Sequence, residues 1–141
     1  MKFGKTAIAA VFGASTMFSA AVTASENHTV TATLTTFEPT VINIAVGDSV
    51  TWTQMNGHDT QSLEGYIPEG AKTWHSQMGA NHTQTFDQEG IYFYICTPHW
   101  GTAMGGVIIV GEPTNYEAIA ANNPRGATRR LMRQLDAHLG N

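Results

Sequence analysis

One stretch decides the fold of this chain: Cys96-Thr97-Pro98-His99-Trp100-Gly101-Thr102-Ala103-Met104. It contains the only cysteine, a histidine three positions later and a methionine five positions after that. Apolar runs at residues 91–95 and 106–110 flank it, and each run predicts a buried β-strand. We therefore expect the stretch to be a loop that joins two strands at one end of a sheet.

The residue types in this loop indicate a metal site. Thiolate and thioether are soft ligands and imidazole is intermediate, so the combination suits copper. A Cys/His/His set with a weak axial Met is typical of a blue-copper electron-transfer site. Cys96, His99 and Met104 supply three of these ligands, and His58 is the best candidate for the fourth. A lone cysteine can also be a buried inert thiol, but its two neighbours favour ligation.

The N-terminus has the pattern of a secretory signal peptide. Lys2 and Lys5 precede a mostly apolar segment at residues 6–18, and Val22-Thr23-Ala24 fits a cleavage site. We expect residues 1–24 to be removed, which leaves a domain of about 117 residues, 25–141. Export to an oxidising compartment makes an unpaired thiol unusual, which again favours a ligand role for Cys96.

The charge of the chain is negative and unevenly distributed. The formal charge is −4, and it becomes −6 once the two N-terminal lysines are removed. Between residues 25 and 117 there is one base, Lys72, against ten acids, whereas four arginines follow residue 124. An acidic body argues against nucleic-acid binding. The acids either form a solvated surface or steer the protein towards a basic partner.

The pattern between these features predicts an all-β sandwich or barrel. Strands are expected at residues 28–34, 41–46, 49–54 and 83–86, besides the two that flank the loop. The turn at Gly47-Asp48 predicts that the second and third strands form a hairpin. Residues 56–80 are a long irregular stretch with His58 at its start, and long loops of this kind are usually functional.

After Gly111 the pattern becomes helical. Thr114 and Glu117 read as a capping box for a short helix that runs to about residue 121. Asn123-Pro124 predicts the start of a second helix. Its apolar stripe recurs every four residues and consists of Ala127, Leu131, Leu135 and Leu139. Both helices are expected to lie against the sandwich, with the second ending at Gly140.

Taken together, these residues resemble the pseudoazurin family of cupredoxins. The motifs that carry the resemblance are Phe37-Glu38-Pro39, Val46-Gly47-Asp48-Ser49-Val50-Thr51, Gly57-His58-Asp59, the segment 63–71 and Cys96-Thr97-Pro98-His99-Trp100-Gly101 with Met104. The resemblance implies an all-β, cupredoxin-like Greek-key β-sandwich of eight strands over residues 25–141, with a helical extension at 114–140. It also implies one type 1 copper per chain, with His58, Cys96, His99 and Met104 as ligands.

The same resemblance implies a soluble periplasmic electron carrier that serves redox proteins, including copper nitrite reductases. We expect a monomer that is not an enzyme, because the ligand set leaves no open position for a substrate. The remaining histidines, His28, His75, His82 and His138, are expected to be surface or strand residues. The alternatives are a copper carrier or chaperone that delivers its metal, and a binding module with a structural metal such as zinc.

Two departures from the family pattern stand out. The family has Asn after the first ligand histidine, where this chain has Asp59, whose side chain should bridge the ligand loops towards Thr97. A negative charge there would favour Cu(II), unless the carboxyl is protonated or compensated. Family members also carry lysines around the copper face, whereas the body of this domain has only Lys72. Trp100 is expected either in a docking rim round an exposed His99 or in ordinary packing.

Overall fold

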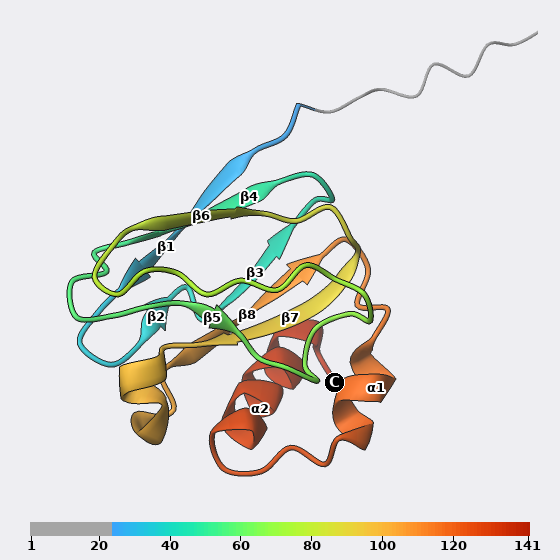
Figure 1. Cartoon of the computed structure of the whole chain (residues 1–141). Coiled ribbons are helices and arrows are strands. Elements are labelled where there is room, and N and C mark those ends of the chain that lie inside the picture. The colour runs from blue at the N-terminus through green and yellow to red at the C-terminus, as the bar shows by residue number, and fades with distance from the viewer. Residues whose placement is uncertain (1–23) are drawn as a thin grey trace, which may run out of the picture.

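The computed structural model describes residues 24–141, which form a sandwich of two four-stranded sheets with two helices (Figure 1). All but the last residue of the predicted signal peptide lie outside the described residues, so that peptide stays a prediction. The all-β sandwich with C-terminal helices is confirmed. None of the helices in the described range has the length and apolar character that crossing a membrane requires.

The first sheet contains β1 (Asn27–Ala32), β2 (Phe37–Glu38), β4 (Ser49–Thr53) and β6 (His82–Thr85), in the order β2-β1-β4-β6. Strand β1 runs parallel to β4, and the other pairs are antiparallel. One face of this sheet packs on the core and the other meets solvent. Buried residues therefore alternate with partly exposed ones in β4, and β6 has one buried residue between two exposed ones, as expected for half-buried strands.

The second sheet contains β3 (Val41–Ile44), β5 (Gln61–Ser62), β7 (Gly90–Ile95) and β8 (Gly105–Val110), in the order β3-β8-β7-β5. Strands β7 and β8 are antiparallel neighbours, as the two apolar runs predict. Both are buried on both faces, which explains why their sequences are continuously apolar instead of alternating.

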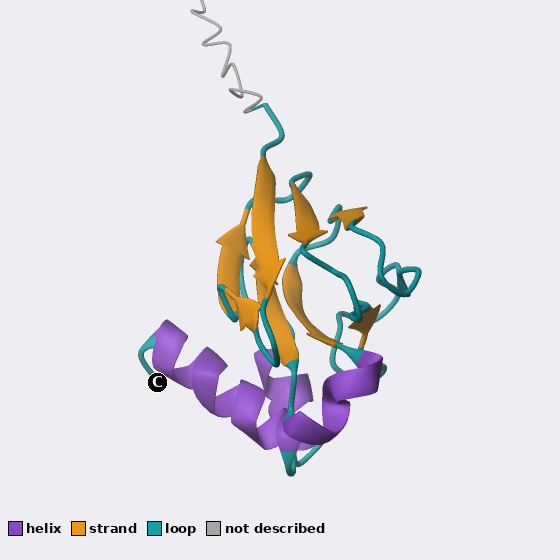
Figure 2. Ribbon diagram, turned by 90° about the vertical axis from the view of Figure 1, so that its left-hand side faces the viewer, coloured by secondary structure: helices purple, strands orange, loops and turns teal. Residues whose placement is uncertain are grey.

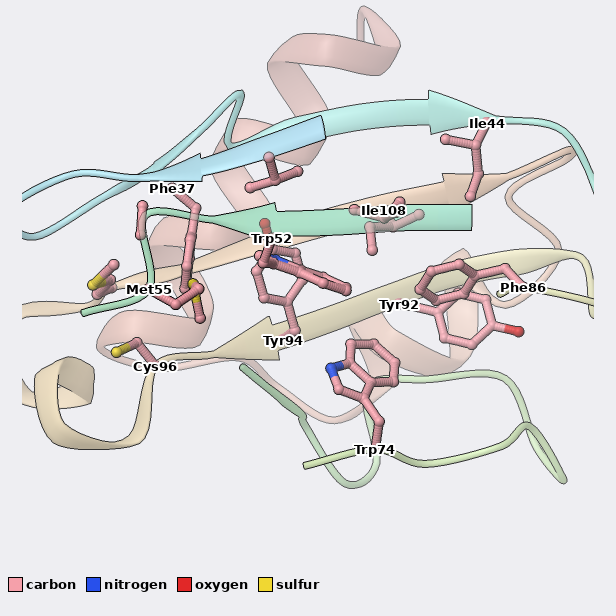
Figure 3. Packing of buried hydrophobic residues seen from close by; sticks show 14 of the residues in the cluster. Phe37, Ile44, Trp52, Met55, Trp74, Phe86, Tyr92, Tyr94, Cys96 and Ile108 are labelled. Atoms are coloured by element: carbon pink, nitrogen blue, oxygen red, sulfur yellow. The ribbon is translucent and has the colours of Figure 1, made fainter. Parts of the chain in front are cut away.

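Alternate residues of β7 enter two separate hydrophobic clusters. Tyr92 and Tyr94 face the first sheet, where Trp52 meets Tyr94 edge-on at a centroid distance of 5.1 Å (Figure 3). Ile91 and Phe93 face the opposite way, towards the helices. The period-two geometry of a strand therefore lets a single strand hold the sandwich core on one side and the helical layer on the other.

The helices α1 (Tyr116–Ala121) and α2 (Ala127–Leu139) cover the outer face of the second sheet (Figures 1 and 2). Leu131 and Leu135 are buried against that sheet and Leu139 is partly buried, so the predicted apolar stripe is confirmed. Gly140 ends α2 in the left-handed conformation, also as predicted.

Two local predictions are wrong. Strands β3 and β4 do not form a hairpin, because β3 pairs with β8 and β4 pairs with β1 and β6. The turn at Gly47-Asp48 instead carries the chain from one sheet to the other. The Asp48 carboxylate stabilises this crossing by accepting bonds from the backbone N–H groups of Glu26 at 2.8 Å and Ala45 at 2.9 Å, and from the His28 ring at 2.8 Å.

The helix starts also differ from the prediction. No side-chain cap forms at α1, because the Asn115 side chain is used elsewhere: it accepts from the Ile91 N–H at 2.7 Å and donates to the Ile91 carbonyl at 2.9 Å. Tertiary bonding to β7 thus replaces the capping box. Helix α2 begins at Ala127, three residues beyond Pro124, since Gly126 takes a non-helical conformation with φ of 55°.

Candidate metal centre

The loop of residues 96–104 leaves β7 and enters β8 at one end of the sandwich. Its two ends are joined, because the Cys96 N–H donates to the Met104 carbonyl at 2.9 Å. The short 3-10 helix η1 (Thr97–Thr102) fills the middle of the loop, with Pro98 in its first turn. Ala103 ends η1 in the left-handed conformation, and the Met104 N–H then donates to the His99 carbonyl at 3.2 Å.

His58 reaches the same place from the segment between β4 and β5. A tight turn forms before it, in which the His58 N–H donates to the Met55 carbonyl at 2.8 Å and Gly57 adopts a φ of 79°. A second backbone bond, from the Gly79 N–H to the His58 carbonyl at 2.8 Å, fixes the far side. Two regions 38 residues apart in sequence thus meet at one end of the molecule.

The structure brings three of the four predicted ligands together. The Nδ1 atoms of His58 and His99 lie 3.6 Å and 3.5 Å from the Cys96 Sγ. One ligand atom from each of these residues lies within 4.8 Å of the others. Metal bonds of about 2.0–2.3 Å to nitrogen and sulfur would place two ligands of a trigonal site about 3.5–3.7 Å apart. The observed separations therefore fit a single metal ion.

Met104 lies at the end of the loop and is fully buried. It belongs to the same hydrophobic cluster as Cys96, Phe37 and Met55. Those three residues lie close together at one end of the core (Figure 3). A thioether in this apolar cluster, on the loop that also carries the cysteine and a histidine, has the chemistry of the weak fourth ligand of a copper site.

Burial sets the protonation of the ligands. It raises the pKa of the Cys96 thiol, so the thiol holds its proton until a metal displaces it. Burial also lowers the pKa of His58, with a further contribution from the nearby His99. A neutral imidazole is the form that binds a metal. A metal cation that binds here would therefore displace one proton, the one on the Cys96 thiol, and would meet His58 already neutral.

Asp59 connects the two ligand segments, as predicted. Its carboxylate accepts a hydrogen bond from the Thr97 N–H at 2.6 Å and another from the Thr97 hydroxyl. Asp59 follows His58 and Thr97 follows Cys96, so the clamp joins residues next to two predicted ligands. Burial alone would raise the pKa of Asp59, but the bonds from Thr97 and His75 outweigh it and hold that pKa below its usual value.

His75 is the residue whose importance the sequence did not reveal. It lies on the surface, as expected, but its Nε2 is 2.9 Å from the Asp59 carboxylate. The other three histidines also lie where they were expected. His28 lies in β1. His82 lies in β6 and stacks on Trp52 of β4, and His138 lies in α2 and contacts Asn43 of β3. No spacing rule could have paired residues 59 and 75, because the segment between them is irregular.

The outer surface of the loop is partly open. His58 is buried, whereas His99 is partly exposed and Pro98 is exposed. Trp100 is only partly exposed and packs against the cluster under the helices, beside Gly105. Of the two expectations for Trp100, the structure favours ordinary packing, and the imidazole edge of His99 is the exposed part of the predicted ligand set.

Comparison with known proteins agrees with this geometry. A family model described as copper binding proteins of the plastocyanin/azurin family matches residues 24–111. Pseudoazurin from Paracoccus pantotrophus is 30% identical over 102 residues, which cover 70% of each chain. The structure of a pseudoazurin from Sinorhizobium meliloti has a TM-score of 0.63 and 39% identity, covering 66% of this chain and 80% of that one. The refined structure of pseudoazurin from Methylobacterium extorquens AM1 has a TM-score of 0.67 at 24% identity, covering 80% and 95%, and supports the fold.

Proposed function

Since the chain belongs to the plastocyanin/azurin family of copper-binding proteins, we propose that it holds its copper between the Cys96 thiolate and the imidazoles of His58 and His99. In this proposal the Met104 thioether would supply a weak fourth ligand. The chain is a type 1 copper electron-transfer protein of the pseudoazurin kind, and it is an electron carrier, not an enzyme. The observation that carries the ligand assignment is the convergence of one thiol and two imidazoles within 4.8 Å.

Copper supplies the redox chemistry when bound, by alternating between Cu(II) and Cu(I). The residues of the chain keep the ligand positions constant between the two states. The bond between Cys96 and Met104 closes the base of the loop, and Asp59 ties the segment that carries His58 to Thr97. A site that does not change shape needs little nuclear rearrangement, so an electron can move quickly.

His99 is the electron entry and exit point in this proposal. Its imidazole is the partly exposed member of a set whose other side chains are buried. Pro98 beside it is exposed and apolar, which suits a small surface for short-lived encounters. The buried Asp59 and the packed Trp100 hold the loop from behind, so a partner that touches His99 meets a rigid surface.

We also propose a periplasmic location and redox proteins as partners, a copper nitrite reductase among them. The support is the signal-peptide pattern of residues 1–24 and the similarity to pseudoazurins. A partner would have to recognise a copper face without the lysines that the family carries there, because the body of this chain has only Lys72.

Spectroscopy of the copper-loaded protein tests the assignment. Cu(II) protein should show an intense thiolate-to-copper band in the visible spectrum that a mild reductant bleaches. Cys96→Ser should abolish the band, whereas His138→Gln, on the exposed side of α2, should leave it unchanged. A band that survives in Cys96→Ser would refute the assignment.

A copper carrier or chaperone remains the alternative, and metal exchange separates the two. An electron carrier should keep its copper against an added chelator while it cycles between redox states at an electrode. Rapid transfer of copper from the folded protein to the chelator would favour the alternative.

A further inference from the structure

The hydrogen-bonded chain Thr97–Asp59–His75 leads from the ligand loop to solvent. Asp59 is only 1% exposed, and its carboxylate accepts bonds from the N–H and hydroxyl of Thr97 and from the His75 ring. The His75 side chain is 55% exposed. An ionised carboxylate only accepts hydrogen bonds. The neutral His75 ring therefore carries its proton on Nε2, and this N–H donates a hydrogen bond to Asp59. Its Nδ1 is therefore free to take up a second proton.

The position of His75 is built into the fold. Residues on both sides of it bond to the strand segment opposite: the Ser76 N–H donates to the Thr60 carbonyl at 2.9 Å, and the Ser62 N–H donates to the Trp74 carbonyl at 3.1 Å. His75 itself forms an isolated β-bridge with Gln61. The backbone of His75 is thus held on both sides, and the ring is directed to Asp59 by a fixed scaffold.

Within residues 24–141, the contacts and surface hollows around this histidine include a small set of charged groups. Asp59 is the carboxylate that it contacts, and Thr97 from η1 is the uncharged residue on the other side of that carboxylate. Glu64 is the other titratable residue that lines the surface hollow next to His75. Lys72, three residues earlier, lines a different hollow with Asp87. The Asp59 carboxylate, which also bonds to Thr97 beside Cys96, therefore links His75 to the ligand loop.

We propose that His75 couples a proton to the electron that this protein carries, an inference that rests on the proposed function. When the site accepts one electron from a redox partner, it loses one unit of positive charge, and His75 binds a proton from solvent at Nδ1. When the electron leaves, His75 returns that proton to solvent. His75 is thus a positioning residue for Asp59 and the proton acceptor of the redox step.

The sign of the effect follows from electrostatics. Protonated His75 places a positive charge near the copper, which favours Cu(I), so the reduction potential should rise as the pH falls through the His75 titration. Conversely, the Cu(I) protein should bind the proton more tightly than a form with a divalent ion. One unit charge at about 10 Å changes proton affinity about 2- to 17-fold as the effective dielectric falls from about 80 to about 20.

Nuclear magnetic resonance of the His75 ring tests the proposal residue by residue. The titration is followed in the Cu(I) protein and in the Zn(II) protein, which is diamagnetic and stands in for Cu(II) in charge. We expect the proton affinity of His75 to be about 2- to 17-fold higher with Cu(I). His138, exposed on α2, is the internal control and should titrate identically in both. Equal titration of His75 in the two forms would overturn the proposal.

Voltammetry adds a second readout. Between pH 5 and 8, His75→Gln should reduce the pH dependence of the reduction potential, whereas His138→Gln should retain it in full. A slope that is the same in His75→Gln as in the parent would also overturn the coupling. Either failure leaves the visible copper band intact, whereas failure of the proposed function would remove that band. The two results are thus distinguishable.

Discussion

Leu131→Ala tests how much the buried apolar stripe of helix α2 contributes to the free energy of unfolding. Leu131 is 1% exposed and belongs to the cluster between the second sheet and the helices. Its Cδ1 lies 3.1 Å from the position that a Cβ on Gly105 would occupy, immediately after the loop of residues 96–104. The residue thus fills the space behind the point where the loop enters β8.

The magnitude follows from the atoms removed. The substitution deletes three buried carbons, worth about 0.8 kcal/mol each in transfer free energy, or about 2.4 kcal/mol together. The cavity that remains adds to this cost, because Leu→Ala changes in rigid cores span about 2–5 kcal/mol. Helix propensity barely changes, since Leu and Ala are both good helix formers. We expect a loss of about 3–4 kcal/mol in the free energy of unfolding.

Urea unfolding of the copper-loaded protein, followed by tryptophan fluorescence, measures this loss. Leu139→Ala is the matched control, with the same substitution in the same helix at a partly buried position. It should cost less than about 1.5 kcal/mol, because fewer contacts are lost. For a domain of this size, the melting temperature of Leu131→Ala should fall by about 10–18 °C. Equal costs at residues 131 and 139 would refute the reasoning, because burial would then not determine the contribution of the stripe.

Three further predictions concern single groups. Asp59→Asn should raise the reduction potential, by about 60 mV if the lost charge acts from about 8 Å at an effective dielectric of about 30, and voltammetry at fixed pH measures this rise. Bonds led by the one from the Glu26 N–H lower the Asp48 pKa to about 2, so the stability that Asp48 contributes is complete above about pH 4 and is lost as the pH falls towards 2. Asp48→Asn should weaken the pH dependence of the free energy of unfolding between about pH 2 and about pH 4. Urea unfolding at pH 3 and at pH 6 should then give more similar free energies than in the parent protein. Gly106→Ala should cost about 1–3 kcal/mol in urea unfolding, because a Cβ at residue 106 would overlap the buried Tyr94 ring; a neutral result would mean that the ring can move aside.

The sequence was most informative where a pattern reports directly on local physics. Strands β7 and β8 are buried on both faces, and their continuous apolar runs predicted this. The ligand loop was predictable because its two ends are neighbours in the sheet, so a short segment had to bring Cys96, His99 and Met104 close together. The stripe of α2 followed from its period of four residues.

The errors arose where distant partners decide the outcome. The turn at Gly47-Asp48 is short enough for a hairpin, but the pairing of β3 with β8 and of β4 with β1 is set by contacts far away in sequence. Asn115 bonds to β7 instead of allowing a capping box at α1. The same limit hid His75, whose partner Asp59 is fixed by an irregular segment that no periodicity describes.

The closed base of the loop of residues 96–104 has a consequence for how such a protein can change. Because the Cys96 N–H and the Met104 carbonyl bond to each other across the ends of β7 and β8, the span between them is closed at its base. Inside the span, Thr97 is tied to Asp59, Trp100 packs on the cluster under the helices, and Met104 enters the core. Substitutions that spare the framework are therefore confined to the exposed positions between these tethers, such as Pro98 and Gly101, and there the redox centre can evolve separately from the stability of the sandwich.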